Sequence, residues 1–365
     1  MLIALGLIAP LAASAEATEE LRILSGANIT PPSVVERFEL ENNIHLRFDF
    51  FDSPEAMGAY IKTKHRGDLA LLRGHYVGKL IQNHLLLPLN HALLPNLKNL
   101  EQTRSGSIDP GNLYSIPYLK GTLGIIYRRD VLGAEKPTWR QLFSQGRGAG
   151  SLAITRRRNT LGADKTAGAD RQSHSAIPFA ITDRYRDAMG LAQSYLGYSY
   201  NSTSPLAISQ AAELLRVLAE KPTFMGFLSP ETTLKYLKEK FIYAAVSYNY
   251  LAAVAMAQDP GLDYTVPAQN GMVWSYVYVV SAKTAKADAA YKWLNFLMEP
   301  EVAAEVAAWN RAASPNEAAR PLLPQEIRGN QVIYPPDEVW GAAEMPLSID
   351  DEAEHMSIDY WSHLK

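Results

Sequence analysis

Short apolar stretches alternate with helical stretches over the first hundred residues. Residues 21–24 form a short apolar run, residues 45–51 alternate apolar and polar side chains with the period of a strand, and residues 68–72 form a third run. A Thr-Pro-Pro run at 30–32 and a Ser-Pro-Glu run at 53–55 predict the starts of two helices, because threonine or serine can cap a helix and proline fits its first turn. Strands separated by helices predict βαβ units and a mainly parallel sheet.

The second half of the chain repeats this alternation. Ser-Pro pairs at 204–205 and 229–230 predict the starts of two more helices. Residues 272–280 are almost continuously apolar or aromatic, as in a strand buried on both faces. Apolar side chains within 290–297 follow helical spacing and predict a helix with one buried stripe. We therefore expect an α/β fold.

The N-terminus has the pattern of a secretory signal peptide. Residues 2–11 are nearly all apolar, and Ala13-Ser14-Ala15 forms a small-x-small cleavage pattern. No Lys or Arg precedes the apolar run, which leaves open a start further upstream, and a buried N-terminal helix is the alternative. No later segment approaches the roughly 20 apolar residues that span a bilayer. We expect an exported, soluble protein cleaved near Ala15.

Composition narrows the functional classes. The 365 residues correspond to about two domains at roughly 150 residues each. Thirty-five basic residues against 38 acidic ones give a net charge of -3, so we expect no nucleic-acid partner. The absence of cysteine excludes a disulfide scaffold, a thiol nucleophile and a zinc-thiolate site. The Arg-, Gly- and Ser-rich stretch 156–175 predicts a solvated loop, with a basic docking patch as the alternative.

Motifs for catalysis are missing from the sequence. It contains no Gly-x-Ser-x-Gly elbow, no His-Glu-x-x-His pair, no phosphate loop and no dinucleotide fingerprint. The eight histidines are scattered, and none pair at i, i+4. We therefore expect no catalytic residues, no metal site and no cofactor, although carboxylate-based catalysis leaves no local motif.

Aromatic residues are the more informative side chains. The chain has 19 Tyr and 6 Trp. Several of them lie at the ends of predicted elements, namely Tyr118, Tyr127, Tyr248, Tyr250, Trp274 and Tyr276. Ligands of open α/β sheets bind at the carboxyl ends of strands, where aromatic rings can stack on a ligand or hold a cation. The alternative is that these rings fill the core.

A series of short segments, in a fixed order over nearly the whole mature chain, resembles a known family. The segments are Pro31-Pro32, Asp68-Leu69-Ala70 before Tyr76-Val77, Leu86-Leu87-Pro88-Leu89, Tyr114-Ser115-Ile116-Pro117-Tyr118 running into Gly121-Thr122-Leu123-Gly124-Ile125, Leu196-Gly197-Tyr198-Ser199 followed by Asn201-Ser202-Thr203, the strand around Trp274, residues 293–300, and Ser314-Pro315-Asn316. In this order they resemble the periplasmic spermidine/putrescine-binding proteins of bacterial ABC importers.

The resemblance implies a two-lobed type-2 periplasmic binding protein. Each lobe is a mainly parallel sheet flanked by helices, and the ligand lies in the cleft between the lobes. After a signal peptide at 1–15, the expected first lobe is 16–128 plus 277–318, and the second is 129–275 plus 319–365. The lobes close on a ligand by hinge motion, and an inner-membrane permease/ATPase complex reads the closed shape.

The resemblance also places the ligand site, with several departures from the family's pattern. The residues at the matching positions are Arg73, His75, Arg184, Asp187, Tyr248, Trp274 and Tyr276. The family's aromatic pair before the first helix is replaced here by Gly26 and Ile29, and a tyrosine before the Pro-Asn pair by Ala312. Small or aromatic residues become Arg73 and His75, two carboxylates become Arg184 and Tyr276, and a tryptophan becomes Ser247.

These departures change the electrostatics expected of the site. Each desolvated ammonium group of a polyamine needs a carboxylate or an aromatic cage. The matching positions keep one carboxylate, Asp187, and add Arg73 and Arg184. We therefore predict that free spermidine or putrescine binds weakly, and that the ligand has an anionic or zwitterionic end. If the alignment is shifted near residue 184, Asp183 and Asp187 become the carboxylates, and this alternative stays open.

Three functions remain after this step. The first is an exported solute-binding protein of a polyamine-type ABC importer. The second is a periplasmic ligand sensor that signals to a membrane receptor, as polyamine-sensor relatives of the family do. The third is an enzyme on the same scaffold, which no visible nucleophile–base set supports.

Overall fold

The computed structural model describes most of the chain, namely residues 19–51, 67–101, 108–133, 135–143, 153–154, 175–268 and 271–364. Three predictions concern segments outside these residues. They are the signal peptide, the helix beginning at 53–55, and the solvated loop at 156–175, of which only Ser175 is described, at the start of a short strand.

A mixed sheet of nine strands runs through the molecule. Its order is β2-β1-β3-β11-β4-β9-β7-β8, and β10 also pairs with β4. The strands are β1 (Glu19–Ser25), β2 (Ile44–Phe50), β3 (Leu69–Arg73), β4 (Ser115–Arg128), β7 (Phe179–Thr182), β8 (Phe224–Leu228), β9 (Ala244–Tyr248), β10 (Leu262–Thr265) and β11 (Met272–Val280). A separate ladder joins β5 (Ala153–Ile154) to β6 (Ser175–Ala176).

The outer strands of this sheet are parallel and the central ones antiparallel. The parallel pairs are β1 with β2 and β3 at one end, and β7 with β8 and β9 at the other. The antiparallel pairs involve β4 or β11, which lie between these two ends. The predicted α/β fold with parallel strands is therefore confirmed, and its antiparallel part lies where the two ends meet.

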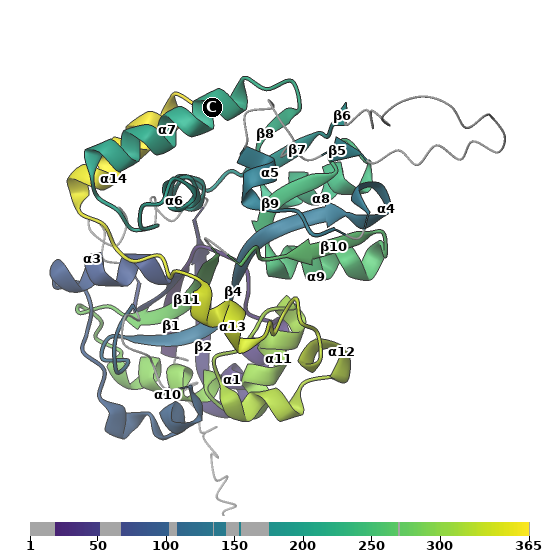
Figure 1. The fold of residues 1–365 in the computed structure, drawn as a ribbon. Helices are drawn as coiled ribbons and strands as arrows, with labels where there is room; N and C mark the ends of the chain where they lie inside the picture. The colour runs from purple at the N-terminus through teal and green to yellow at the C-terminus, as the bar shows by residue number, and fades with distance from the viewer. Residues whose placement is uncertain are drawn as a thin grey trace, which may run out of the picture.

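Helices cover both ends of the sheet. They are α1 (Pro32–Asn42), α3 (Val77–Gln82), α4 (Arg129–Leu132), α5 (Trp139–Phe143), α6 (Tyr185–Tyr195), α7 (Pro205–Ala219), α8 (Pro230–Lys238), α9 (Asn249–Gln258), α10 (Ala287–Leu297), α11 (Pro300–Asn310), α12 (Gln325–Arg328), α13 (Asp337–Ala342) and α14 (Asp351–Ser362). Short 3-10 turns are η1 (Gly74–Tyr76), η2 (His91–Leu93), η3 (Pro95–Asn99) and η4 (Glu317–Leu322). Figure 1 shows α1, α10 and α11 around the lower half of the molecule, and α6 to α9 and α14 around the upper half.

The chain passes between these halves along strand β4. The first part of β4 pairs with β11 in the lower half, and its last residues pair with β9 and β10 in the upper half (Figure 1). β11 leads back toward β3, and the segment between α13 and α14 crosses again, because α14 packs against α6 and α7. The two halves are therefore joined by a few strands and segments, which is the arrangement that a hinge needs.

Most predicted element positions are confirmed, and one cap is wrong. β11 has the predicted bounds, α7 and α8 begin at the prolines of their Ser-Pro pairs, and α10 buries the predicted apolar stripe. Thr30 does not cap α1, whose N-cap is Pro31. The Thr30 hydroxyl is buried and lies 3.2 Å from the hydroxyls of Tyr278 and Tyr118. Buried phenols need hydrogen-bond partners, and Thr30 is used for that purpose.

The last part of the chain divides between the two halves. Ala319, Leu323 and Ile327 of η4, α12 and their connection pack in a cluster with residues of α11. The same cluster includes Ala253 of α9. The exact lobe boundaries at 128, 276 and 318 stay a prediction. None of the helices among the described residues has the length and apolar character that crossing a bilayer requires.

Candidate functional site

A buried ion pair lies where the two halves meet. Arg73 ends strand β3 in the lower half, and Asp187 lies in the first turn of helix α6 in the upper half. Nη2 of Arg73 lies 3.1 and 3.2 Å from the two carboxylate oxygens of Asp187. Only 9% of Arg73 and 1% of Asp187 is exposed. The pair is therefore a desolvated, charge-assisted contact that bridges the two halves.

Local structure fixes both members of this pair. Arg73 lies opposite Tyr276 in the ladder between β3 and β11. The chain then turns at Gly74, where an added Cβ would lie 2.1 Å from Ile108 and 2.5 Å from the Ser275 hydroxyl. Asp187 lies near the N-terminus of an 11-residue helix, where the helix dipole favours a negative charge.

Two tyrosine hydroxyls complete the shell of the Asp187 carboxylate. Tyr200, in the connection between α6 and α7, donates to Oδ1 at 3.1 Å, and Tyr248, at the end of β9, donates to Oδ2. Burial, followed by the nearby charge of Asp187, raises the pKa of both phenols well above 10. Both hydroxyls therefore stay protonated and act as donors. The carboxylate accepts hydrogen bonds from three residues.

Aromatic rings surround the Arg73 guanidinium. Its carbon lies 5.5 Å from the ring centre of Tyr248 and 5.9 Å from that of Tyr276, within the range of a cation–π contact. Tyr248 stacks on Tyr250 with a centroid distance of 5.6 Å, and Trp274 meets Tyr250 and Tyr276 edge-on. We call this carboxylate and these aromatic faces the cage, because such groups together are the usual partners of an organic cation.

Neighbouring residues hold this cage in place. Asn249 Oδ1 accepts from the indole of Trp274 at 3.1 Å and from the backbone N–H of Thr122 at 3.0 Å. Gly121 gives room for them, since a Cβ there would lie 2.1 Å from Asn249 Oδ1 and 2.4 Å from Trp274. The cage is therefore supported independently of Arg73.

Arg184 and His75 lie beside the cage. Arg184 precedes α6, and 43% of its side chain is exposed; its Nε lies 3.8 Å from Asp183. Burial raises the pKa of Tyr250, and the positive charges of Arg73 and Arg184 partly oppose that rise. His75 has a buried Nε2 with no hydrogen-bond partner among the described residues. Burial, and then the charges of Arg73 and Arg186, lower the pKa of His75 well below 6.5, so its ring is neutral.

The structure brings the predicted site residues together. Five of them form the cage and its ion pair, namely Arg73, Asp187, Tyr248, Trp274 and Tyr276. Arg184 and His75 lie at its edges. Asp187 supplies the carboxylate of the cage, whereas Asp183 lies beside Arg184. The binding role of these residues stays a prediction.

Sequence reasoning missed two supporting residues, Tyr200 and Asn249. Tyr200 lies in a connection outside any periodic segment, 13 residues after Asp187, and no local pattern marks it. The sequence could have indicated Asn249, because this polar residue lies between two tyrosines, Tyr248 and Tyr250. Tyr250 was already part of the aromatic set.

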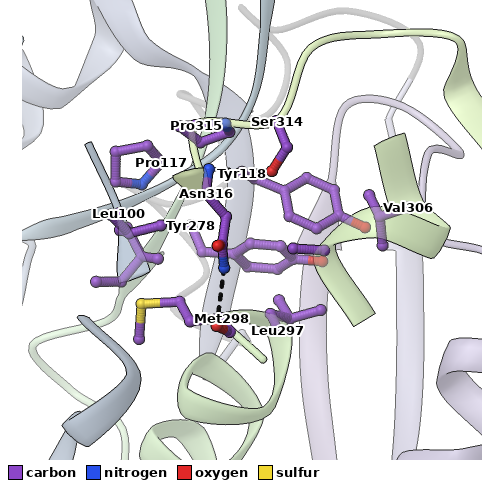
Figure 2. A pocket seen from close by; sticks show the side chains of 12 residues that line it. Leu100, Pro117, Tyr118, Tyr278, Leu297, Met298, Val306, Ser314, Pro315 and Asn316 are labelled. Atoms are coloured by element: carbon purple, nitrogen blue, oxygen red, sulfur yellow. Dashed lines mark hydrogen bonds between the residues drawn. The ribbon is translucent and has the colours of Figure 1, made fainter. Parts of the chain in front are cut away.

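A hollow in the lower half differs in character from the cage. Figure 2 shows that it is lined by apolar side chains such as Leu100, Leu297 and Val306, with the rings of Tyr118 and Tyr278 between Leu100 and Val306. Asn316 donates to the Met298 carbonyl at 2.9 Å across it. The described residues that line this hollow are apolar or uncharged. The described residues include no group of three or more acidic or histidine side chains that could hold a metal ion.

Comparisons with known proteins identify the family of the chain. Residues 33–328 match the family described as bacterial extracellular solute-binding protein. The spermidine/putrescine-binding periplasmic protein of Salmonella typhimurium is 28% identical over 97% of this chain and 94% of its own length. The putrescine/agmatine-binding protein of Pseudomonas aeruginosa is 26% identical over 92% of this chain and 88% of its own.

A solved structure shows the same fold. It is described as a putative spermidine/putrescine ABC transporter from Listeria monocytogenes. The match has a TM-score of 0.79 and 27% identity, and covers 95% of this chain and 98% of that one. The predicted two-lobed fold and the predicted resemblance are thereby confirmed.

Proposed function

Because the chain belongs to the bacterial extracellular solute-binding proteins, we propose that it binds a small solute between its two halves and presents it to an ABC importer. The names of the relatives from Salmonella typhimurium and Pseudomonas aeruginosa support a polyamine-type system, and that of the Listeria monocytogenes structure supports the transporter. The observation that carries the proposal is the set of charged and aromatic side chains that meets at the junction of the halves. A solute bound there would couple its binding to their closure.

The ligand class follows from which charged side chains at the site can still pair with a solute. The Asp187 carboxylate already accepts from Arg73, Tyr200 and Tyr248, so it has little capacity left for an added ammonium group. Arg184 is half-exposed beside the same rings and its only nearby acid lies 3.8 Å away among the described residues. Asp187 is paired closely with Arg73, whereas Arg184 is paired only loosely with Asp183. The favoured ligand therefore has a carboxylate or another anionic end that Arg184 binds.

The compartment follows from the same reading. The relative from Salmonella typhimurium is named as a periplasmic protein, and the apolar segment at 2–11 with its small residues at 13–15 supports export with cleavage near Ala15. Binding and release without bond-making is the expected output, with no catalytic residue. A sensory role has less support than transport, because the relatives are named as binding proteins and the solved structure as a transporter.

A series of four-carbon solutes tests the proposed ligand class. Putrescine carries two ammonium groups, 4-aminobutyrate carries one ammonium and one carboxylate, and succinate carries two carboxylates. Thermal unfolding and titration calorimetry of the mature protein should show binding of 4-aminobutyrate or succinate that is at least tenfold tighter than binding of putrescine. Ligand binding to the folded state raises the unfolding temperature.

Two variants control this experiment. Arg184→Ala should weaken binding of the carboxylate-bearing solute at least tenfold, because a charge-assisted hydrogen bond is lost. Arg216→Ala removes an exposed arginine on α7, away from the junction, and should bind as the wild type does. Micromolar binding of putrescine or spermidine to the wild type would contradict the proposed ligand class.

A further inference from the structure

Arg73 is placed as a bound cation would be. Its guanidinium contacts a buried carboxylate through Nη2 and lies near the faces of Tyr248 and Tyr276. These are the partners that a protein offers to an organic cation from solution. Here the cation is attached to strand β3 by its own side chain.

The cage does not depend on Arg73 for its shape. Tyr248 is stacked on Tyr250, and Trp274 is fixed through its indole N–H by Asn249. Tyr200 is held in position against Gly190, where a Cβ would lie only 2.4 Å from its ring. With the Arg73 side chain removed, these groups would surround the space that it leaves whenever the two halves are closed.

A free cation cannot enter this cage while Arg73 occupies it. Both oxygens of Asp187 are engaged, and a second positive charge would meet Arg73 within a few ångströms in a desolvated space. Arg184 adds another positive charge at the edge. Exclusion is therefore steric and electrostatic.

From this geometry we propose that Arg73 acts as a built-in ligand, and that it is the residue that sets the specificity of the site against free amines and guanidines. The proposal rests on the proposed function, since it concerns the same site. It goes further in assigning the cage to small organic cations, namely alkylguanidinium and primary ammonium ions. It also assigns the exclusion of these cations to the side chain of Arg73. Shortening Arg73 should convert the site into one that binds such cations.

The test compares three variants of the mature protein. Arg73→Ala opens the cage, Arg73→Lys keeps an attached cation, and Arg73→Ala with Asp187→Asn removes the carboxylate as well. The probes are N-ethylguanidinium, which matches the lost side chain, and putrescine. Arg73→Ala should bind both at least tenfold tighter than the wild type in calorimetry, and N-ethylguanidinium should raise its unfolding temperature. Arg73→Lys and the double variant should show no such gain.

A further control tests whether shortening any buried, paired arginine creates a site for cations. Arg128 is also buried and paired, with Asp130 and Asp259, but it lies at the end of β4 away from the cage. Arg128→Ala should gain no binding of putrescine. If Arg73→Ala does not fold, its folding in the presence of N-ethylguanidinium becomes the measurement, and recovery of the native circular dichroism spectrum is expected.

Outcomes for the inference and for the proposed function are distinct. A folded Arg73→Ala variant with no gain for either probe, or an unfolded one that N-ethylguanidinium does not restore, overturns the role of Arg73. Equal binding of putrescine by wild type and variant also overturns it. If the wild type binds none of the four-carbon solutes while Arg73→Ala gains binding, the proposed ligand class fails and the role of Arg73 stands.

Discussion

At the scale of single residues, the neutral ring of His75 is a consequence of the charges around it. His75 follows Arg73 by two residues and lies in a crevice lined also by Lys79, Arg186 and Glu354. Burial and the positive charges of Arg73 and Arg186 lower its pKa well below 6.5. In the unfolded chain this histidine titrates near its ordinary value. In mildly acidic solution His75 therefore binds a proton in the unfolded state but not in the folded state.

This difference predicts a stability loss on acidification. Above pH 6.5 His75 is neutral in both states and contributes no pH dependence. As the pH falls below 6.5, only the unfolded state is protonated, so the free energy of unfolding decreases by up to about 1.4 kcal/mol per pH unit. The decrease ends once the pH passes the lowered pKa of the folded state. Urea unfolding of wild type and His75→Gln between pH 7.5 and 5 should show this slope only in the wild type.

A matched histidine makes this measurement specific. His84 lies at the end of α3 and is exposed, so His84→Gln should keep the wild-type slope. Equal slopes in wild type and His75→Gln would contradict the assignment of the pH dependence to His75.

The sequence placed the members of the cage near one another but not their pairing, and their role in binding stays a prediction. The positions of Arg73 and Asp187 followed from the order of segments along the chain. Their mutual contact did not, because it depends on how strand β3 and helix α6, 114 residues apart, are brought together. The contribution of Tyr200 was missed for the same reason, since a loop residue has no periodicity.

At the scale of elements, the C-terminal strap ties the two halves together. We use this name for residues 345–354, which lead from the lower half into α14. Lys79 of α3 forms ion pairs with Asp351 and Glu354, and its backbone N–H donates to the Ser348 hydroxyl at 3.1 Å. Burial lowers the pKa of Lys79, but hydrogen bonds to Asp351 and Glu354 raise it overall. Lys79 therefore stays charged at neutral pH.

Removing this lysine should loosen the strap. Lys79→Ala should lower the free energy of unfolding by about 1 kcal/mol, because one of its two acidic partners is largely exposed and such pairs contribute little. Hydrogen exchange should become faster in α14 and remain unchanged in α10, which lies in the lower half. Lys286→Ala, which alters a more exposed and longer ion pair with Asp68, serves as the control. Unchanged exchange in α14 would show that the lysine does not hold the strap.

Element prediction worked where the pattern of side chains was regular. The strand at 272–280 and the helices after Ser-Pro pairs were found because their periods and starts are local properties. The strap was assigned to the second lobe, yet its contacts with α3 could not be predicted. A tertiary contact also replaced the expected cap of Thr30.

At the scale of the whole molecule, the Arg73–Asp187 pair favours the arrangement in which the halves are closed. One partner lies on β3 and the other on α6, so the contact is lost when the halves separate. Removing one partner of a buried pair costs roughly 3–5 kcal/mol when the other charge stays desolvated. Opening lets water reach Asp187 and relieves that cost. Every ~1.4 kcal/mol lost from the closed arrangement lowers its population relative to the open one tenfold.

Solution scattering can measure this shift. Without ligand, Arg73→Ala should have a larger radius of gyration than the wild type. N-ethylguanidinium should contract the variant, because it binds the closed cage better than the open one, and should leave the wild type unchanged. Arg216→Ala, whose ion pairs lie within α7, should scatter as the wild type does. Equal radii for Arg73→Ala and wild type would mean that the pair does not influence closure, and that strand β4 and the C-terminal strap set the relative position of the halves without it.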